Sequence, residues 1–71
     1  MTVIEAFRKN VKEELNNIHW SQAELARVSG ISKHTINGLL NGHHGPSLYT
    51  AYQITKSLEV SLDYLIEGAD E

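Results

Sequence analysis

The chain carries four histidines, and two of them, His43 and His44, are adjacent. Neutral imidazole is a common ligand of transition metals, so a metal site is the first chemistry to consider at this pair. Neighbouring residues face one ion only in irregular backbone, and no third ligand follows at a spacing typical of zinc sites. We therefore expect no metal here and assign the pair to a solvated loop or to hydrogen-bond donation beside phosphate.

The sequence motifs of common enzymes are absent. The chain has no glycine-rich phosphate loop, no nucleophile elbow and no H-E-x-x-H motif, and its Ser, His and Asp residues show no spacing typical of a catalytic triad. Without cysteine, neither a disulfide framework nor a thiolate zinc site can form. We expect a protein that is not an enzyme and needs no cofactor.

The length of 71 residues and the 41% content of hydrophobic residues indicate one small domain spanning residues 1–71. A domain of this size buries only about 60% of the surface that its unfolded chain exposes, so a partner subunit would add stability. No apolar run approaches the roughly 20 residues of a membrane span, and the N-terminus lacks the pattern of a signal peptide. We expect a cytoplasmic protein that makes no contact with a membrane.

The formal net charge of −3 is unevenly distributed along the chain. Between residues 18 and 47, Glu24 is the single acid, set against Arg27, Lys33 and the four histidines. Residues 57–71 contain five acids and no base. Two interpretations of this asymmetry remain open. In the first, the middle segment faces a polyanion and the acidic end is directed away from it. In the second, the charges are simply scattered along the chain.

Five positions have the features of helix starts, since each is a Ser or Thr followed by apolar residues at helical spacing. They are Thr2, Ser21, Ser32, Ser47 and Ser61. Glu5 and Glu24 complete the capping-box pattern at the first two starts. The first, second, third and fifth helices are predicted to end at Asn16-Asn17, before Gly30, at Leu40 before Asn41-Gly42, and at Gly68.

Apolar spacing predicts which faces of these helices are buried. The expected stripes are Ile4, Phe7, Val11 and Leu15 in the first helix, and Leu48, Ala51, Ile54 and Leu58 in the fourth. Between the second and third helices, a small Ala26 permits close helix crossing and Gly30 permits a tight turn before Ile36. We predict an all-α, compact five-helix fold with a helix-turn-helix formed by the second and third helices.

Four sequence blocks occur in a characteristic order and cover nearly the whole chain. They are Ser21-Gln-Ala-Glu-Leu-Ala26, Gly30-Ile-Ser-Lys-His-Thr-Ile36, Asn41-Gly42 and Leu58-Glu-Val-Ser-Leu-Asp-Tyr-Leu65. Together they resemble the phage repressor and Cro type of helix-turn-helix protein, also called the xenobiotic-response-element family. The resemblance implies a lambda-repressor-like DNA-binding domain whose third helix enters the major groove while the second lies across the phosphate backbone.

The resemblance also implies roles for individual side chains. The implied base-contacting residues are Ser32, Lys33, His34 and Asn37. Lysine donates to guanine O6 and N7, asparagine pairs with adenine through two bonds, and histidine can donate to a purine acceptor. The implied backbone-contacting residues are Gln22, Thr35, Asn41 and His43. The alternative for the same side chains is an ordinary solvated helix face.

Members of this family commonly form twofold dimers around the loop into the fifth helix and that helix itself. Carried over, this implies a homodimer interface of Val60, Leu62 and Ile66, with Leu65 in the core. A twofold axis would place the third helices of the two subunits about 34 Å apart on one face of DNA. We assign the aromatic residues to core or interface rather than to base stacking; they are Trp20, Tyr49, Tyr52 and Tyr64.

Three departures from the family pattern carry predictions. Leu15 and Leu40 stand where many members pair an Arg with a Glu, and we predict that the two leucines touch. Gly38 replaces a larger polar residue, either because the backbone approaches DNA there or because the helix frays, since glycine costs about 1 kcal/mol in a helix interior. Ser29 replaces an apolar residue, for which local repacking is the expected explanation.

Lys33 and Arg27 are the permanent cations expected near the DNA face, so the phosphate-binding contribution should be weak. We expect moderate affinity, a shallow salt dependence, and stronger binding below about pH 6.5 as histidines protonate. These histidines are His34, His43 and His44.

The resemblance implies a sequence-specific DNA-binding transcription regulator. We expect a repressor that binds double-stranded DNA as a homodimer at an inverted repeat. Family members also serve as antitoxins and as controllers of restriction-modification systems. The alternative from another class is a protein-interaction module of the same fold, such as an antitoxin-like protein that binds a partner protein. The negative net charge and the few cations favour this alternative.

Overall fold

A serine or threonine hydroxyl starts every helix in residues 1–70, the part of the chain that the computed structural model describes. The helices are α1 (Val3–Ile18), α2 (Gln22–Ser29), α3 (Lys33–Leu40), α4 (Leu48–Leu58) and α5 (Leu62–Leu65). Each cap accepts a hydrogen bond from the backbone N–H three residues later. This confirms the five starts predicted at Thr2, Ser21, Ser32, Ser47 and Ser61.

The first two caps differ in how completely they form a capping box. At Thr2 the box is complete, because the Thr2 N–H donates to Glu5 Oε1 at 2.7 Å and the Glu5 N–H donates to Thr2 Oγ1 at 3.1 Å. The Thr2 N–H bonded to the Glu5 carboxylate, and next the Thr2 hydroxyl beside it, lower the pKa of Glu5. At Ser21 the hydroxyl accepts from the Glu24 N–H at 3.1 Å, whereas the Glu24 carboxylate is paired with Arg27 at 2.8 Å. The box predicted there is therefore only half formed.

Left-handed residues end several of the helices. Gly30 ends α2 with φ 76°, as predicted, whereas His19 and Glu59 take φ 61° and 57° after α1 and α4 although they carry side chains. The fifth helix is shorter than expected, since α5 ends at Leu65, and Gly68 takes φ 94° in the turn that follows.

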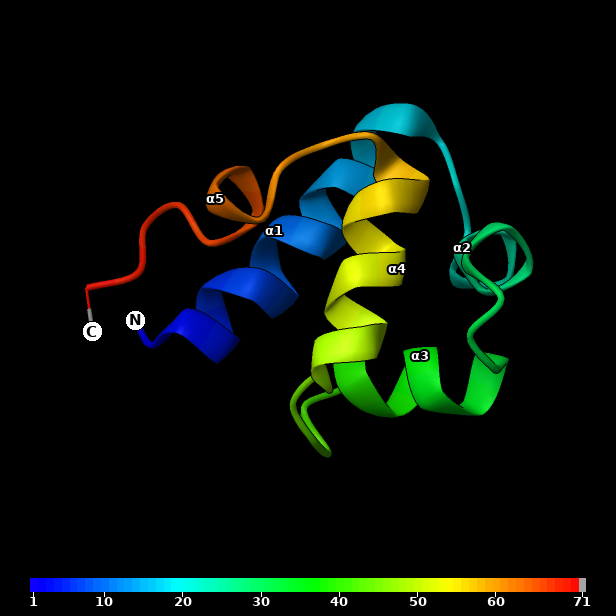
Figure 1. Ribbon diagram of the computed structural model, residues 1–71, viewed down its shortest axis with the longest axis horizontal. Helices are drawn as coiled ribbons and strands as arrows, with labels where there is room; N and C mark the ends of the chain where they lie inside the picture. Colours follow the sequence, from blue (N-terminus) through cyan, green and yellow to red (C-terminus); the bar gives the residue numbers. More distant parts are fainter. Residues whose placement is uncertain (71) are drawn as a thin grey trace.

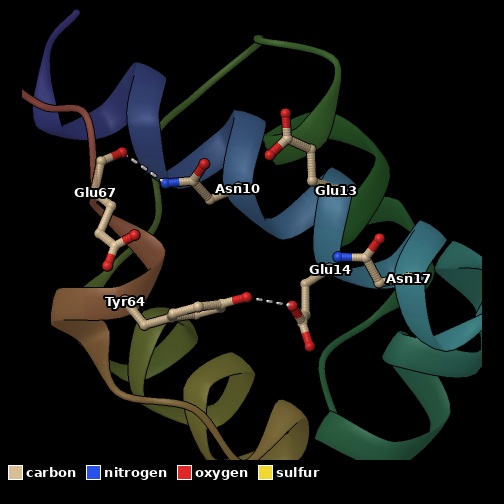
Figure 2. A pocket seen from close by; sticks show the side chains of 6 residues that line it. All are labelled: Asn10, Glu13, Glu14, Asn17, Tyr64 and Glu67. Atoms are coloured by element: carbon tan, nitrogen blue, oxygen red, sulfur yellow. Dashed lines mark hydrogen bonds between the residues drawn. The ribbon is translucent and has the colours of Figure 1, made fainter.

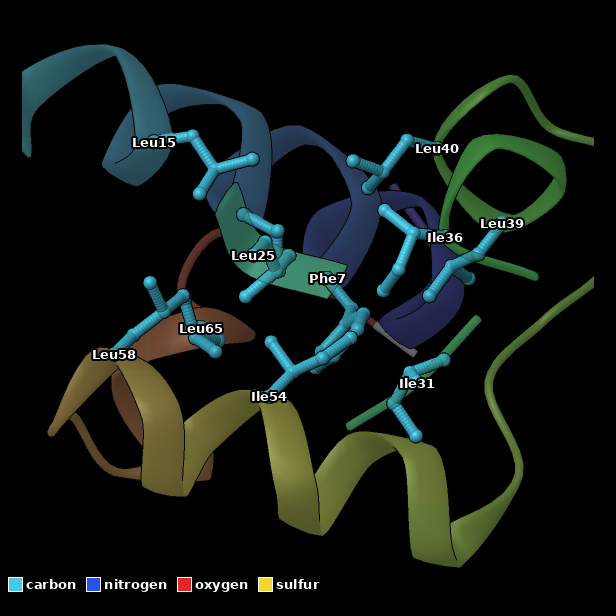
Figure 3. Packing of buried hydrophobic residues seen from close by; sticks show 11 residues of the cluster. Phe7, Leu15, Leu25, Ile31, Ile36, Leu39, Leu40, Ile54, Leu58 and Leu65 are labelled. Atoms are coloured by element: carbon cyan, nitrogen blue, oxygen red, sulfur yellow. The ribbon is translucent and has the colours of Figure 1, made fainter. Parts of the chain in front are cut away.

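The core is a single apolar cluster enclosed by all five helices. Figure 1 shows α1 and α4 in the centre of the view, with α3 at the bottom, α2 at one end and α5 at the other. In Figure 3 the buried side chains of these elements point toward one another around Phe7 and Ile54. The cluster comprises Phe7, Val11, Leu15, Leu25, Ile31, Ile36, Leu39, Leu40, Ile54, Leu58 and Leu65.

Two predicted core residues lie at the surface instead. Ile4 is 39% exposed, and its methyl groups pack against the backbone of Gly45 rather than entering the cluster. Leu48 is 87% exposed, so its assignment to the buried stripe of α4 was wrong. The buried face of α4 begins instead at Thr50, whose hydroxyl accepts a 3.0 Å hydrogen bond from Ser47. A satisfied hydroxyl can occupy a core position at little cost.

Leu15 and Leu40 both belong to the buried cluster, with exposures of 4% and 0%. Two apolar side chains thus replace the Arg and Glu that many members of the resembled family pair at these positions. The contact predicted between them remains a prediction that a coupling experiment can test.

The two ends of the described chain meet beside the start of α1. The amino group of Met1 lies 2.7 Å from Asp70 Oδ1, and the Asp70 N–H donates to the Met1 carbonyl oxygen at 3.0 Å. Asn10 on α1 donates to the carbonyl oxygens of Leu65 and Glu67 at 3.0 and 2.9 Å. These bonds hold the segment after α5 against α1. No helix in residues 1–70 has both the length and the apolar character needed to cross a membrane.

Candidate nucleic-acid interface

The turn between α2 and α3 is fixed by a buried serine that sequence reasoning treated only as repacking. Ser29 is 2% exposed, and its hydroxyl accepts from the Ile31 N–H at 3.2 Å and donates to the Ala26 carbonyl oxygen at 3.5 Å. Gln53 on α4 donates to the Ser29 carbonyl oxygen at 3.0 Å. Together with the positive φ of Gly30, these bonds set how α3 projects from α2.

The start of α3 presents the predicted base-contacting residues to solvent. Lys33 and His34 are exposed, Asn37 is half-buried, and no hydrogen bond joins these three side chains to any other part of residues 1–70. Ser32 differs from them, because its hydroxyl accepts from the Thr35 N–H at 3.1 Å and donates to Thr35 Oγ1 at 2.9 Å. The Ser32 and Thr35 hydroxyls therefore serve first to cap the helix.

An open pocket of about 230 Å³ lies between the exposed face of α3 and the loop that follows it. Four of the eight predicted DNA-contacting residues line it: His34, Asn37, Asn41 and His43. The remaining two lining residues are Gly38 and His44. The structure thus brings predicted base-contacting and backbone-contacting residues together on one surface.

The ring of His44 packs against Gly38 in the middle of α3. A Cβ atom added at Gly38 would lie 2.7 Å from Nε2 and 3.1 Å from Cδ2 of His44, which is closer than real Cβ contacts. The ring of His44 therefore occupies the space of the missing side chain. The two explanations expected for Gly38, close approach of DNA and fraying of the helix, stay predictions beside this contact.

Gln22 lies apart from that pocket, at the start of α2. It lines a second open pocket of about 270 Å³ together with Lys12 and Asn16 of α1. The N–H groups of the first helical turn are directed toward the start of a helix, where anions are favoured. Lys12 adds a full positive charge beside this helix start.

Arg8 is a second cation that sequence reasoning did not place near the interface. Its Nε donates to the Leu39 carbonyl oxygen at 2.9 Å, and its guanidinium carbon would be 3.9 Å from a Cβ atom at Gly42. Within residues 1–70 no carboxylate forms an ion pair with Arg8. The one sequence signal was the i, i+4 spacing of Arg8 and Lys12, which places both on one side of α1.

Arg27, by contrast, is less available than expected. Its guanidinium forms an ion pair with Glu24 at 2.8 Å, and the hydrogen bond and charge of that carboxylate raise the pKa of Arg27. The same pair lowers the pKa of Glu24. Arg27 stays exposed in this pair, so Arg8 and Lys12 are added to Lys33 and Arg27 as candidate cations for the interface.

The residues predicted for a dimer interface differ in exposure. Val60 and Ile66 are partly buried against the core, whereas Leu62 is 46% exposed. Leu62 lines an apolar groove of about 140 Å³ whose other walls come from α4. These wall residues are Leu48, Ala51, Tyr52 and Thr55. Leu48 and Tyr52, which are 87% and 58% exposed, thus extend the predicted interface onto α4.

An acidic pocket of about 100 Å³ lies between α1 and α5, away from α3 (Figure 2). Three glutamates line it: Glu13, Glu14 and Glu67. The Tyr64 hydroxyl donates to Glu14 Oε1 at 3.0 Å, and this hydrogen bond and the carboxylate charge raise the pKa of Tyr64. Because carboxylates repel phosphate, this side is unsuited to DNA, which favours the interpretation that the acidic end is directed away from a polyanion.

Metal ligands do not gather in the described part of the chain. No group of three or more His, Asp or Glu side chains in residues 1–70 is arranged to hold a metal ion. His44 instead directs Nδ1 to the Gly45 carbonyl oxygen at 3.1 Å and its ring onto Gly38.

Comparisons with known proteins agree with this geometry. A family model described as helix-turn-helix matches residues 11–65. The antitoxin HipB of Escherichia coli O6:H1 is 42% identical over 43 residues, which make up 61% of this chain and 46% of that protein. The chain therefore spans about half the length of this curated relative. No solved structure matches the chain.

Proposed function

The chain belongs to the helix-turn-helix family whose model covers residues 11–65, and from this premise we propose that it is a sequence-specific DNA-binding transcription regulator. One observation carries the proposal. Lys33, His34 and Asn37 lie on α3 with no hydrogen-bond partner in residues 1–70, and the helix itself packs against α2 and the core. Side chains of these types can pair with base edges in the major groove.

In this proposal α3 lies in the major groove and the ends of the motif contact the phosphate backbone. Lys33, His34 and Asn37 contact bases, with Ser32 at the helix start beside them. Contacts to phosphate come from Gln22, Thr35, Asn41 and His43, through side chains or through the N–H groups next to them. The placement of Asn41 and His43 beside the α3 pocket supports their role at one edge of the groove.

Arg8 and Lys12 strengthen the phosphate contacts in this arrangement. Arg8 lies beside the loop that contains Asn41 and His43, and Lys12 lies beside Gln22. Each end of the proposed interface thus has one permanent cation from α1. We therefore expect a steeper salt dependence than Lys33 and Arg27 alone would give.

The regulator acts as a homodimer in this proposal, through the apolar groove between α4 and α5. Leu48, Tyr52 and Leu62 line this groove and are all exposed, and a contiguous apolar patch of this kind is typical of an interaction surface. A twofold dimer would contact two half-sites of an inverted repeat, and occupancy of such a site would repress transcription by blocking the polymerase.

The second candidate is a protein-interaction module that binds a partner protein in the manner of an antitoxin. The same groove and the negative net charge favour it, and the relative HipB is described as an antitoxin. In this case a different polypeptide, rather than a second copy, would cover Leu48 and Leu62.

Selection from a random duplex library at about 0.1 M salt tests the proposal. Enrichment of an inverted repeat with half-site centres about 10 base pairs apart supports the dimeric regulator. Retention without enrichment, lost as salt rises, indicates nonspecific attraction and favours the interaction module. The two candidates also separate by mutation, since Lys33→Ala and Asn37→Ala affect only the first, whereas Leu62→Asp disrupts both dimer and partner binding.

A further inference from the structure

The ring of His44 fills the position of an absent side chain on the exposed face of α3. A Cβ atom at Gly38 would be 2.7 Å from His44 Nε2, 3.1 Å from Cδ2 and 3.8 Å from Cε1. Three atoms of the ring thus surround the point where residue 38 would begin its side chain. Any residue larger than glycine would displace the ring.

Contacts on both sides of His44 hold the loop in this place. The His43 N–H donates to the Gly38 carbonyl oxygen at 2.8 Å, which fastens the loop to α3 one residue before the ring. On the other side, Gly45 packs against Ile4 of α1, whose Cδ1 would be 3.2 Å from a Cβ atom at that glycine. The His44 Nδ1 donates to the Gly45 carbonyl oxygen at 3.1 Å, which fixes the ring orientation.

The ring adjoins the residues that the proposed function assigns to base contact. Position 38 lies one helical turn after His34, so a side chain there would share the face of His34. His34, Asn37 and His44 all line the same open pocket. His44 is itself exposed to solvent, which is unlike a histidine whose role is to fill the core.

We propose that His44 is an additional base-contacting residue, which the loop supplies to α3 in place of a side chain at Gly38. This proposal rests on the proposed DNA-binding function and adds a residue that sets its specificity. The ring meets a base in the major groove through its face and carbon atoms, because Nδ1 is bonded to the Gly45 carbonyl oxygen and Nε2 faces Gly38. Gly38 is then a positioning residue, needed because it leaves the space that His44 occupies.

A double-mutant cycle tests the pairing of the two residues. We expect His44→Ala to weaken binding to the selected operator by about tenfold or more, as loss of a base contact does. Gly38→Ala should weaken binding by a similar factor, because the new methyl group displaces the ring. In the His44→Ala background, Gly38→Ala should cause no further loss. Losses that multiply in the double variant would overturn the pairing.

The DNA sequence preference of the His44→Ala variant shows whether the ring contacts a base or has only a structural role. Library selection with this variant should lose base preference at one position of each half-site and retain it at the others. His43→Ala is the matched control, because loss of a phosphate contact weakens binding to all sequences equally. A His44→Ala variant with an unchanged sequence preference would show that the ring only packs against α3, and this variant remains informative even if Gly38→Ala does not fold.

The same selections distinguish failure of this proposal from failure of the proposed function. If the unsubstituted protein enriches no DNA sequence, the proposed sequence-specific DNA binding is contradicted, and with it the role of His44. A natural chain that enriches an operator, combined with a His44→Ala variant that enriches the identical one, would overturn the role of His44 alone.

Discussion

Arg8 Nε donates a 2.9 Å hydrogen bond to the carbonyl oxygen of Leu39, so that the first helix holds the last turn of α3. The bond uses one of the five N–H donors of the guanidinium group. The group lies against Gly42, whose lack of a side chain leaves that side open. Arg8 thus stabilises the negative end of the α3 dipole, and under the proposed function its remaining donors bind a phosphate.

Arg8→Gln should make DNA binding less dependent on salt. The loss of one phosphate contact lowers the slope of log affinity against log salt concentration by about one, because one fewer counterion is released. Titrations with a labelled operator at several salt concentrations measure the slope. Lys9→Gln is the control, since Lys9 forms an exposed ion pair with Glu13 and should leave the slope unchanged. An Arg8→Gln protein with weaker binding but the same slope would indicate that Arg8 only supports the loop.

Asn37→Ala should relax specificity at one base position of each half-site. A bidentate contact between an asparagine side chain and adenine contributes about 1–3 kcal/mol of discrimination. Competition between the operator and its single-base variants measures this loss. Lys56→Ala removes a cation from the last turn of α4, where it lies 5.7 Å from the Tyr52 ring, and should leave discrimination intact. Equal discrimination by the Asn37→Ala and natural proteins would contradict the assignment.

Leu48→Asp should convert the protein from dimer to monomer without unfolding it. The side chain is 87% exposed in the single chain, so an aspartate there costs little in the monomer but is unfavourable in an apolar interface. Sedimentation equilibrium measures the change in mass. Val28→Asp is the matched control, because Val28 is an exposed apolar residue on α2, outside the groove. A Leu48→Asp protein that remains dimeric would place the twofold contact elsewhere.

Glu14→Gln should return the pKa of Tyr64 toward its ordinary value. The hydrogen bond and charge of Glu14 raise the pKa of Tyr64 in the folded protein. Such a bond stabilises the fold at pH values below the ordinary tyrosine pKa of about 10 and is lost as the pH rises through the raised folded value. Ultraviolet absorbance titration of tyrosinate measures the shift. Glu13→Gln keeps the hydrogen bond and should move the pKa less, so equal effects of both variants would contradict the cause.

Leu15 and Leu40 should be energetically coupled. Replacing either buried leucine with alanine is expected to lower the free energy of unfolding by about 2–5 kcal/mol. If the side chains touch, the double variant should depart from additivity by about 0.5 kcal/mol or more. Urea denaturation of the four proteins in the cycle provides the energies. Additive losses would mean that the two leucines occupy separate parts of the cluster.

The sequence predicted those features that depend on residues close together in the chain. Each helix cap needs only a hydroxyl and the N–H three residues later, so all five starts could be placed from the sequence. The turn at Gly30 likewise needs only a residue that tolerates positive φ. Apolar periodicity was less reliable at Leu48, because the polar Thr50 holds the first buried position of α4.

The features that sequence reasoning missed depend on contacts between separate segments. Arg8 and Leu39 are 31 positions apart, and no local pattern indicates that a guanidinium on α1 meets the end of α3. The glycine at position 38 was visible as an anomaly, but its cause required the path of the loop that brings His44 back onto the helix. Side-chain exposure in the groove between α4 and α5 also depends on how these two helices pack.

The contact between Met1 and Asp70 has a practical consequence for protein engineering. Met1 and Asp70 occupy one corner, at the opposite end of the long axis from the start of α3 (Figure 1). A label placed next to either residue would therefore lie far from the helix that the proposed function assigns to the major groove. Such a label should report on the fold while leaving the proposed DNA interface unobstructed.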